Sequence, residues 1–133
     1  MVIFMTDFDR LCESIFTIDH YIRYVRILGK NGVSLAGRYR NDEIPRYFTN
    51  HEINELEQFY YFIWGIAKFH KPRLGDLNCA ILEFDKIRKF AFALDDGKLL
   101  IVSTNPKASA DIKDKIQENI TTILKIFSSN LTT

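Results

Sequence analysis

The stretch Asp95-Asp96-Gly97-Lys98-Leu99-Leu100-Ile101-Val102-Ser103-Thr104 decides the fold of this chain. Its four consecutive apolar residues, Leu99 to Val102, predict a strand buried on both faces of a sheet, because the side chains of a strand alternate between the faces. A strand of this kind belongs in the centre of the sheet, with other elements packed on either side. The turn at 95–97 predicts a hairpin with the preceding apolar run, residues 87–94.

A second hairpin is predicted nearer the N-terminus. Residues 21–28 and 33–40 are rich in β-branched and aromatic residues, and Gly29-Lys30-Asn31-Gly32 separates them. Asn31-Gly32 favours a tight turn, because both residue types tolerate a positive φ angle. A phosphate-binding loop needs a longer glycine-rich turn that opens a helix, so these glycines indicate a hairpin and not a nucleotide site. The run 77–84 supplies a fifth strand.

Helical spacing of apolar residues predicts helices at both ends of the chain. The first is capped by Thr6, ends near Asp19 or His20, and carries the stripe Phe8, Leu11, Cys12, Ile15 and Phe16. The last is capped by Ser109 and carries the stripe Ile112, Ile116, Ile120, Ile123 and Phe127. Both stripes are one-sided, as expected for helices that cover a sheet.

A middle helix begins at the capping box formed by Thr49 and Glu52. It is expected to run to about Phe69 and to end before Lys71-Pro72 and Gly75, because proline disfavours helical geometry at the residue before it and glycine commonly follows a helix end. The order is then helix, two strands, helix, three strands, helix. The predicted fold class is α+β, with a five-stranded antiparallel sheet and helices on both faces. One domain is expected over residues 1–133, with its core at about 6–127.

The middle helix has two apolar faces, which together cover roughly 220° of its circumference, against ~100° or more for a one-sided helix. We assign the first to the sheet: Ile53, Leu56, Tyr60, Ile63, Trp64 and Ala67. The second consists of Phe59, Phe62, Ile66 and Phe69, and the polar remainder of Asn54, Glu57, Gln58 and Lys68. Loops or the apolar N-terminal tail are one possible cover for the second face. A subunit interface is favoured, since large exposed apolar patches mark contact sites and self-complementary ones close as two-fold dimers.

Composition excludes several classes of protein. Eighteen basic and 17 acidic residues give a net charge of +1, which predicts neither nucleic acid nor an anionic membrane as a partner. The chain has no apolar run long enough for a membrane span, and a cytoplasmic location is expected. Cys12 and Cys79 fall in apolar patterns and are interpreted as small buried residues, with no disulfide framework.

Catalytic and metal-binding patterns are missing from the sequence. His20, His51 and His70 are not at metal-ligand spacing, and neither cysteine has an activating neighbour. The acidic pairs Asp42-Glu43 and Asp95-Asp96 fall in turns, where Asp bonds to local backbone. The sequence therefore predicts a protein that is not an enzyme and that holds no cofactor.

Arginines concentrate in the first hairpin and its exit; they are Arg23, Arg26, Arg38, Arg40 and Arg46. Arg38 and Arg40 flank Tyr39, so both are expected on one sheet face. One interpretation is a basic and aromatic surface that receives phosphate, acidic protein or nucleic acid. The other is a charged edge strand protected from aggregation, which the small net charge favours.

Two segments, residues 27–36 and 98–106, resemble the roadblock/dynein light-chain family of the profilin-like and longin-like group. The resemblance implies a central last strand, the middle helix on one face and the terminal helices on the other. It also implies dimers joined through the middle helix and the strand at 78–84, and a role as scaffold or regulator of a small GTPase. The predicted interface residues are Phe59, Phe62, Ile66, Phe69, Cys79 and Ile81.

A family of small uncharacterised archaeal proteins has a similar layout. The matching segments are Leu11-Cys12 with Ile15, Asp19 to Arg23, Ala36-Gly37, Leu74-Gly75 and Leu99 to Ser103. An alternative function also remains open, because profilin-like sheets can hold a pocket between sheet and helix. The chain would then be a small-ligand sensor, with its pocket near Trp64, Tyr60 and Tyr24.

Overall fold

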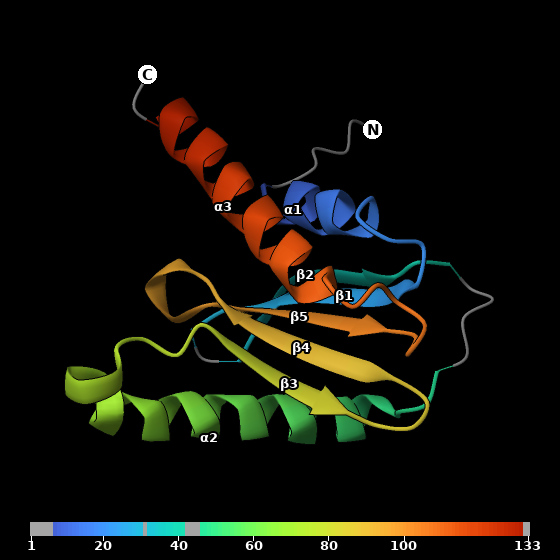
Figure 1. Ribbon diagram of the computed structural model, residues 1–133, viewed down its shortest axis with the longest axis horizontal. Helices are drawn as coiled ribbons and strands as arrows, with labels where there is room; N and C mark the ends of the chain where they lie inside the picture. The colour runs from blue at the N-terminus through green and yellow to red at the C-terminus, as the bar shows by residue number, and fades with distance from the viewer. Residues whose placement is uncertain (1–6, 31, 42–45, 132–133) are drawn as a thin grey trace.

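A five-stranded antiparallel sheet separates two layers of helix in the computed structural model of the chain (Figure 1). The structure describes residues 7–30, 32–41 and 46–131, with side chains up to residue 125. The elements are α1 (Asp7–Phe16), β1 (Ile22–Leu28), β2 (Ser34–Tyr39), α2 (Asn50–Leu74), β3 (Cys79–Glu83), β4 (Arg88–Ala93), the short 3-10 turn η1 (Asp95–Gly97), β5 (Leu99–Thr104) and α3 (Ile112–Leu131).

The strand order is β2-β1-β5-β4-β3, so β5 is central and β2 and β3 are the two edges. All six residues of β5 are buried, which confirms the position predicted from its apolar run. Both predicted hairpins are present. The first closes where the Gly29 amide donates to the Val33 carbonyl at 2.7 Å, and the second closes through η1, where Asp96 and Gly97 adopt positive φ angles.

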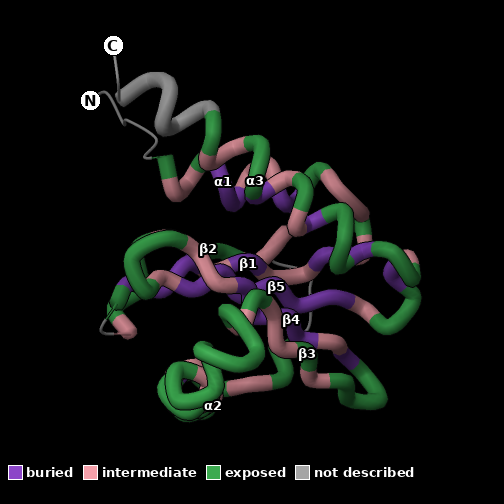
Figure 2. The backbone as a smooth tube through the Cα atoms, turned by 60° about the vertical axis from the view of Figure 1, so that its left-hand side comes forward, coloured by how far each residue is buried: buried purple, intermediate pink, exposed green. Residues whose placement is uncertain are grey.

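Helices α1 and α3 cover one face of the sheet, and α2 covers the other (Figure 1). The larger core lies on the first face, where Leu11 and Ile15 of α1 and Ile112 and Ile116 of α3 meet the sheet. The α2 face has a smaller core around Tyr60, which is fully buried. Figure 2 shows buried residues concentrated in the sheet and in the inner sides of α1 and α3, while most of α2 is exposed.

Helix α2 begins as predicted, with Thr49 and Glu52 forming both bonds of the capping box. Its predicted end is wrong: the helix continues through Pro72 to Leu74 and stops at Gly75, whose φ is 80°. Pro72 lies in the last turn of the helix and removes one amide donor, but the turn still closes, because the Gly75 amide donates to the Lys71 carbonyl at 2.8 Å. The positive φ of Gly75 is the stronger stop signal.

One smaller prediction about the helices also needs correction. Helix α3 begins at Ile112, so Asp111 and not Ser109 directly precedes it. The Ser109 carbonyl instead accepts the Ile112 amide at 3.1 Å, which tightens the approach to the helix. Thr6 and the side chain of Phe127 lie outside the described residues. In the described part of the chain, no helix is long and apolar enough to cross a membrane.

Candidate interaction surface

The second apolar face of α2 is exposed. Phe59, Phe62, Ile66 and Phe69 retain 47%, 64%, 46% and 84% of their accessible surface. Their spacing of three, four and three residues is that of the a and d positions of a coiled-coil seam. The residues that were assigned to the sheet are buried or half-buried, so the predicted division of the helix into two faces is confirmed.

Strand β3 adds a second exposed apolar feature next to this seam. Ala80 and Leu82 pack toward α2, whereas Cys79 packs on the opposite core with α1 and α3. Ile81 shares the face of Cys79, because residues two apart in a strand point the same way, and it is 44% exposed. Phe84, just beyond the strand, is exposed to a similar degree.

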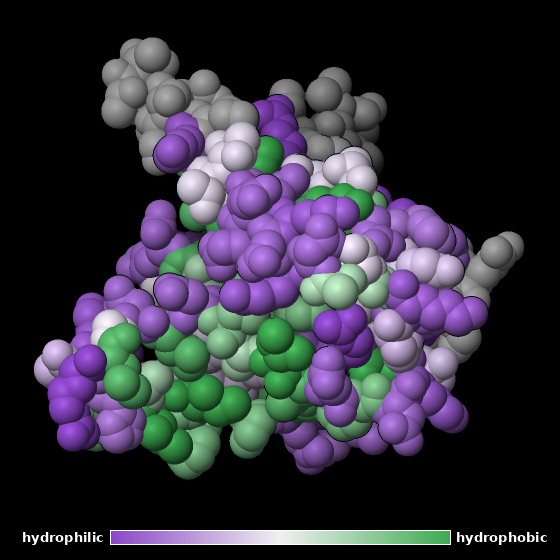
Figure 3. Space-filling view, in the orientation of Figure 1, coloured by the Kyte–Doolittle hydropathy of each residue, from purple (hydrophilic) through white to green (hydrophobic). Residues whose placement is uncertain are grey.

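Five of the six predicted interface residues are therefore exposed, and Cys79 is half-buried. Figure 3 shows the hydrophobic side chains gathered over the lower part of the molecule, where α2 and β3 lie, beneath a largely hydrophilic upper part. The surface comprises a helix seam and a free strand edge side by side. We call the seam together with β3 the α2–β3 surface.

The arginines of the first hairpin have structural partners. Arg38 and Arg40 lie on one sheet face, as predicted, and both guanidinium groups contact the Phe16 ring of α1. Arg38 also pairs with Glu13 at 2.6 Å. Arg40 donates to the carbonyls of Phe16, Asp19 and Ile22 at 2.8, 2.6 and 2.7 Å. These two arginines hold the end of α1 to β2. Arg23 and Arg46 lie over the rings of Tyr47 and Tyr39.

A buried charge cluster lies beneath the N-terminal half of α2. Arg26 Nη1 is 2.6 Å from Glu57 Oε1, and their side chains are 18% and 6% exposed. Glu57 was predicted to belong to the polar side of the helix, and that prediction is wrong. Its spacing of four from Ile53 and three from Tyr60 places it on the sheet-facing side. Burial raises the pKa of Glu57, and the neighbouring Arg26 and Lys89 oppose the rise.

Lys89 of β4 is the third member of this cluster and was missed from the sequence. Burial lowers its pKa, while Glu57 opposes the effect. The sequence did contain a signal for it. Side chains two apart in a strand share a face, so Lys89 is expected on the same face as Ala91, which is the α2 face. The cluster holds two cations and one carboxylate, so it carries an excess positive charge.

The cysteine, histidine and acidic side chains of the described residues do not gather as a metal site. No group of three or more His, Cys, Asp or Glu side chains is placed to hold a metal ion within the described residues. Cys12 and Cys79 are both free thiols. Burial raises the pKa of Cys12 to about 12 and that of Cys79 to about 11, so neither is an activated nucleophile near neutral pH.

A groove of about 710 Å³ lies between the C-terminal half of α2 and the β4–β5 turn. Trp64 and Tyr61 line it from the helix, and both are anchored by backbone acceptors. Trp64 Nε1 donates to the Leu77 carbonyl at 3.1 Å, and the Tyr61 hydroxyl donates to the Gly29 carbonyl. Gly65 also lines the groove, and a Cβ built there would meet no atom within 4 Å.

Comparison with known proteins identifies the fold. No protein-family model matches the chain, and no curated protein is similar to it in sequence. Solved structures do match it over almost its whole length. A Roadblock/LC7 domain from Streptomyces avermitilis is 14% identical, with a TM-score of 0.66, over 96% of this chain and 100% of that domain.

Two MglB structures match as well. Myxococcus xanthus MglB is 16% identical, with a TM-score of 0.68, over 93% of this chain and 97% of that one. A structure of MglB with a tetrameric arrangement is 12% identical, with a TM-score of 0.70, over 95% and 93%. The fold is that of roadblock/LC7 domains, as the resemblance predicted.

Proposed function

We propose that this chain is a non-enzymatic interaction module that forms a homodimer through the α2–β3 surface. The observation that carries the proposal is the coiled-coil-like seam of α2 beside the free edge of β3. Its three phenylalanines alone expose on the order of 400 Å², since a Phe side chain presents about 150–250 Å². One partner in a standard interface buries about 800 Å², so the seam and β3 together are of suitable size.

A homodimer suits this surface for two further reasons. A seam repeated on two antiparallel copies of α2 is self-complementary, and a two-fold axis beside it also brings the two β3 edges together. The tetrameric arrangement of one MglB structure supports the view that this fold assembles through its own copies.

Sedimentation equilibrium of the purified chain tests the dimer. We expect the wild type to be dimeric at micromolar concentration and the double variant Phe62→Ser/Phe69→Ser to be a folded monomer. The control variant Val33→Ser/Leu35→Ser removes two exposed apolar side chains near β2 and should remain dimeric. A wild type that stays monomeric at several hundred micromolar would contradict the proposal. A seam variant that unfolds, as seen by circular dichroism, would assign its residues to the core.

We further propose that the dimer acts in the cytoplasm as a scaffold or regulator of a small GTPase. The roadblock fold and the resemblance of residues 27–36 and 98–106 to that family support this role. The test is calorimetric titration of the dimer with purified small GTPases of the same organism, loaded with GDP or with a GTP analogue. We expect binding whose affinity depends on the bound nucleotide. If none of the GTPases binds in either nucleotide state, the proposed role is overturned.

The groove beside Trp64 supports a second candidate, a small-ligand sensor. Its volume lies within the usual 300–1,000 Å³ of ligand sites, and a glycine within a helix costs about 1 kcal/mol relative to alanine. No described atom lies near the Cβ position of Gly65. A ligand packed against this position would explain why a glycine and not a larger residue stands there. Trp64 is the only tryptophan, so small aromatic carboxylates that bind should change its fluorescence. Gly65→Leu should abolish that change, and no response to any compound would remove this candidate.

A further inference from the structure

The apolar seam of α2 continues into a charged residue at each end. Glu55 precedes the first phenylalanine of the seam by four residues, and Arg73 follows the last by four. Because the a and d positions of a seam alternate at spacings of three and four, both charged residues belong to it. All six members are exposed. We call this set the α2 stripe; it consists of Glu55, Phe59, Phe62, Ile66, Phe69 and Arg73.

The α2 stripe is symmetric about position 64. Its four apolar members lie two and five residues on either side of this position, and its two charged members lie nine residues on either side. Two antiparallel copies of α2 related by a two-fold axis at position 64 therefore meet in register. Each apolar residue of the stripe then faces an apolar residue of the other copy, and Glu55 of each copy faces Arg73 of the other.

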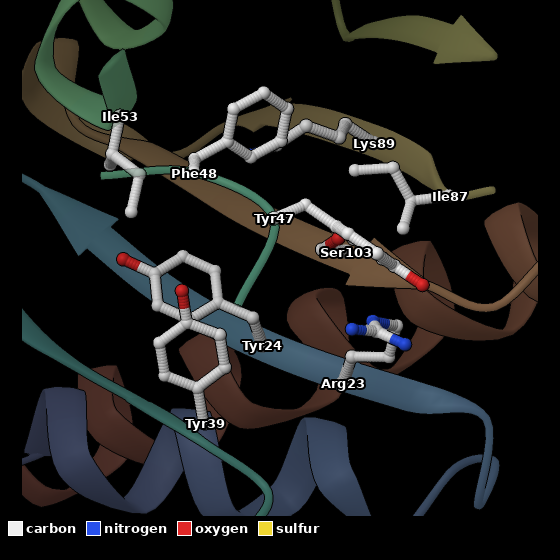
Figure 4. A pocket seen from close by; sticks show the side chains of 9 residues that line it. All are labelled: Arg23, Tyr24, Tyr39, Tyr47, Phe48, Ile53, Ile87, Lys89 and Ser103. Atoms are coloured by element: carbon white, nitrogen blue, oxygen red, sulfur yellow. The ribbon is translucent and has the colours of Figure 1, made fainter. Parts of the chain in front are cut away.

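Contacts with the rest of the chain fix the direction in which the α2 stripe points. Ile53 points from the start of the helix into a small cavity over the sheet (Figure 4). Farther along, Glu57 pairs with Arg26 of β1 at 2.6 Å, and Trp64 Nε1 donates to a backbone carbonyl before β3 at 3.1 Å. Glu55 follows Ile53 by two residues, which places it about 200° around the helix and away from the sheet. The stripe is thus held outward in the single chain.

Both charged ends of the stripe are accessible to a second chain. Arg73 is exposed and forms no ion pair with a described residue. Glu55 Oε1 lies 3.0 Å from His51 Nε2 in the preceding turn, but the two side chains are 67% and 83% exposed. Such an exposed pair is weak, and the carboxylate can accept a further donor because it has two oxygens.

We infer that two copies of α2 pack antiparallel with position 64 on the two-fold axis, and that Glu55 and Arg73 form an ion pair at each end of the interface. The inference rests on the proposed homodimer and adds the residues that set its register and select a second copy as the partner. Strand β3 fits the same axis. It runs alongside α2 (Figure 1), and Ala80 and Leu82, which flank its middle residue, pack into the same small core as Trp64.

Shifted registers of the two helices are unfavourable. A shift by one heptad keeps a and d positions in contact but sets Glu55 against Ile66 of the other copy. The opposite shift sets Arg73 against Phe62. Either arrangement brings an unpaired charge onto apolar surface, which costs free energy. The apolar contacts therefore provide the affinity, and the charged ends exclude the wrong registers.

Charge reversal tests this register by sedimentation equilibrium. Glu55→Arg makes both ends of the stripe basic, and Arg73→Glu makes both ends acidic, so like charges meet twice in each homodimer. We expect each variant alone to dimerise with a dissociation constant at least tenfold above that of the wild type. An equimolar mixture of the two variants should form heterodimers with wild-type affinity, because an acid then faces a base at both ends.

Two further measurements separate this pairing from a general effect of charge. The double variant Glu55→Arg/Arg73→Glu exchanges the two ends, and its dissociation constant should lie within threefold of that of the wild type. Glu118→Arg and Lys125→Glu are the matched controls, because they reverse exposed charges of α3 on the opposite face of the sheet, and each should leave the constant unchanged. Circular dichroism should show the same helix content in every variant, since arginine and glutamate are both good helix formers.

The outcomes distinguish failure of the register from failure of the homodimer. A wild type that is monomeric at several hundred micromolar removes the homodimer and this inference with it. A dimeric wild type whose affinity neither single variant lowers keeps the homodimer but overturns the register. Single variants that dimerise weakly and are not restored by mixing overturn it as well, because Glu55 and Arg73 then contact other groups.

Discussion

Strands β2 and β3 lie at opposite edges of one sheet, and the two edges differ in the regularity of their pairing and in their charge. The pairing of β2 with β1 is interrupted by a register shift at Ile27 and Leu28. Arg38 donates to the backbone carbonyls of Tyr39 and Arg40 at 3.3 Å, where β2 ends. Irregular pairing and charge at an edge both discourage a further strand from adding to it.

Strand β3 lacks these devices. It pairs with β4 in regular register over five residues, and its sequence is Cys79-Ala80-Ile81-Leu82-Glu83, with its single charge at the end. Among the described residues, no arginine or lysine donates to the backbone of β3. A flat apolar edge of this kind favours pairing with another strand.

The contrast supports the dimer proposed above. Both edges expose unpaired backbone groups, so sheet geometry alone would permit growth in either direction. Shielding of β2 leaves β3 as the single open edge, and the apolar seam of α2 lies beside it and not beside β2. In the proposed dimer, assembly through β3 closes after two copies, since each copy contributes its β3 edge.

Placing the same charge on each edge is the most severe test of this contrast. Ile81→Lys on β3 and Leu35→Lys on β2 alter side chains of similar exposure, 44% and 38%. We expect Ile81→Lys to raise the dimer dissociation constant at least a hundredfold, because two-fold symmetry brings both new charges close to the interface. Leu35→Lys should change it less than threefold. Sedimentation equilibrium over a dilution series measures both constants. Equal weakening by the two variants would show that β3 is not the preferred edge.

Loss of Arg40 should loosen the attachment of α1 to the sheet without affecting assembly. Arg40→Met removes three hydrogen bonds from a charged donor to carbonyls at and after the end of α1. We expect a loss of about 2 kcal/mol in the free energy of unfolding, since such bonds contribute about 1.5–3 kcal/mol each and water replaces part of them. Urea denaturation provides the measurement.

Arg10→Met is the matched control for this experiment. It removes an exposed ion pair with Asp7 at 3.7 Å, and surface pairs of this type contribute about 0–1 kcal/mol. The dissociation constant of the dimer should be unchanged in both variants. A weaker dimer in Arg40→Met would mean that a change on the β2 side of the molecule alters the affinity of the interface.

Local patterns were sufficient to predict most of this fold. The apolar run of β5 predicted its central position, and the Asn31-Gly32 turn predicted the first hairpin, because each pattern has one dominant structural solution. The two faces of α2 were also predictable, since helical spacing alone assigns residues to faces. Glu57 was left out of the sheet-facing group because of its charge, although its spacing from Ile53 and Tyr60 fits that group.

The features missed from the sequence depend on partners distant in the chain. Glu57 is buried because Arg26 of β1 pairs with it, and Lys89 is buried because Tyr24 and Phe48 enclose it. Hydrophobicity alone assigns both residues to solvent, since an unpaired charge is seldom buried. The extension of α2 beyond Pro72 was missed for a different reason: a proline in the last turn removes one amide donor without preventing the turn from closing at Gly75.

The smallest expected difference between the two edges is in thiol reactivity. Cys79 belongs to β3, whereas Cys12 belongs to α1, the helix held against β2 by Arg38 and Arg40. Burial raises the pKa of Cys12 to about 12 and that of Cys79 to about 11. Because the thiolate is the reactive form, a difference of one pH unit gives about a tenfold difference in thiolate population.

Iodoacetamide should therefore modify Cys79 about ten times faster than Cys12, as measured by peptide mass spectrometry. Both rates should rise about tenfold for each unit between pH 8 and 10, where the folded-state thiols remain mostly protonated. Unfolded thiols ionise near pH 9.0, so protein stability falls as the pH rises above that value, and the experiment must stay within the folded range. The ratio should widen in Ile81→Lys if that variant uncovers β3. Faster modification of Cys12 would reverse the comparison, because the shielded side of the sheet would then be the one that opens first.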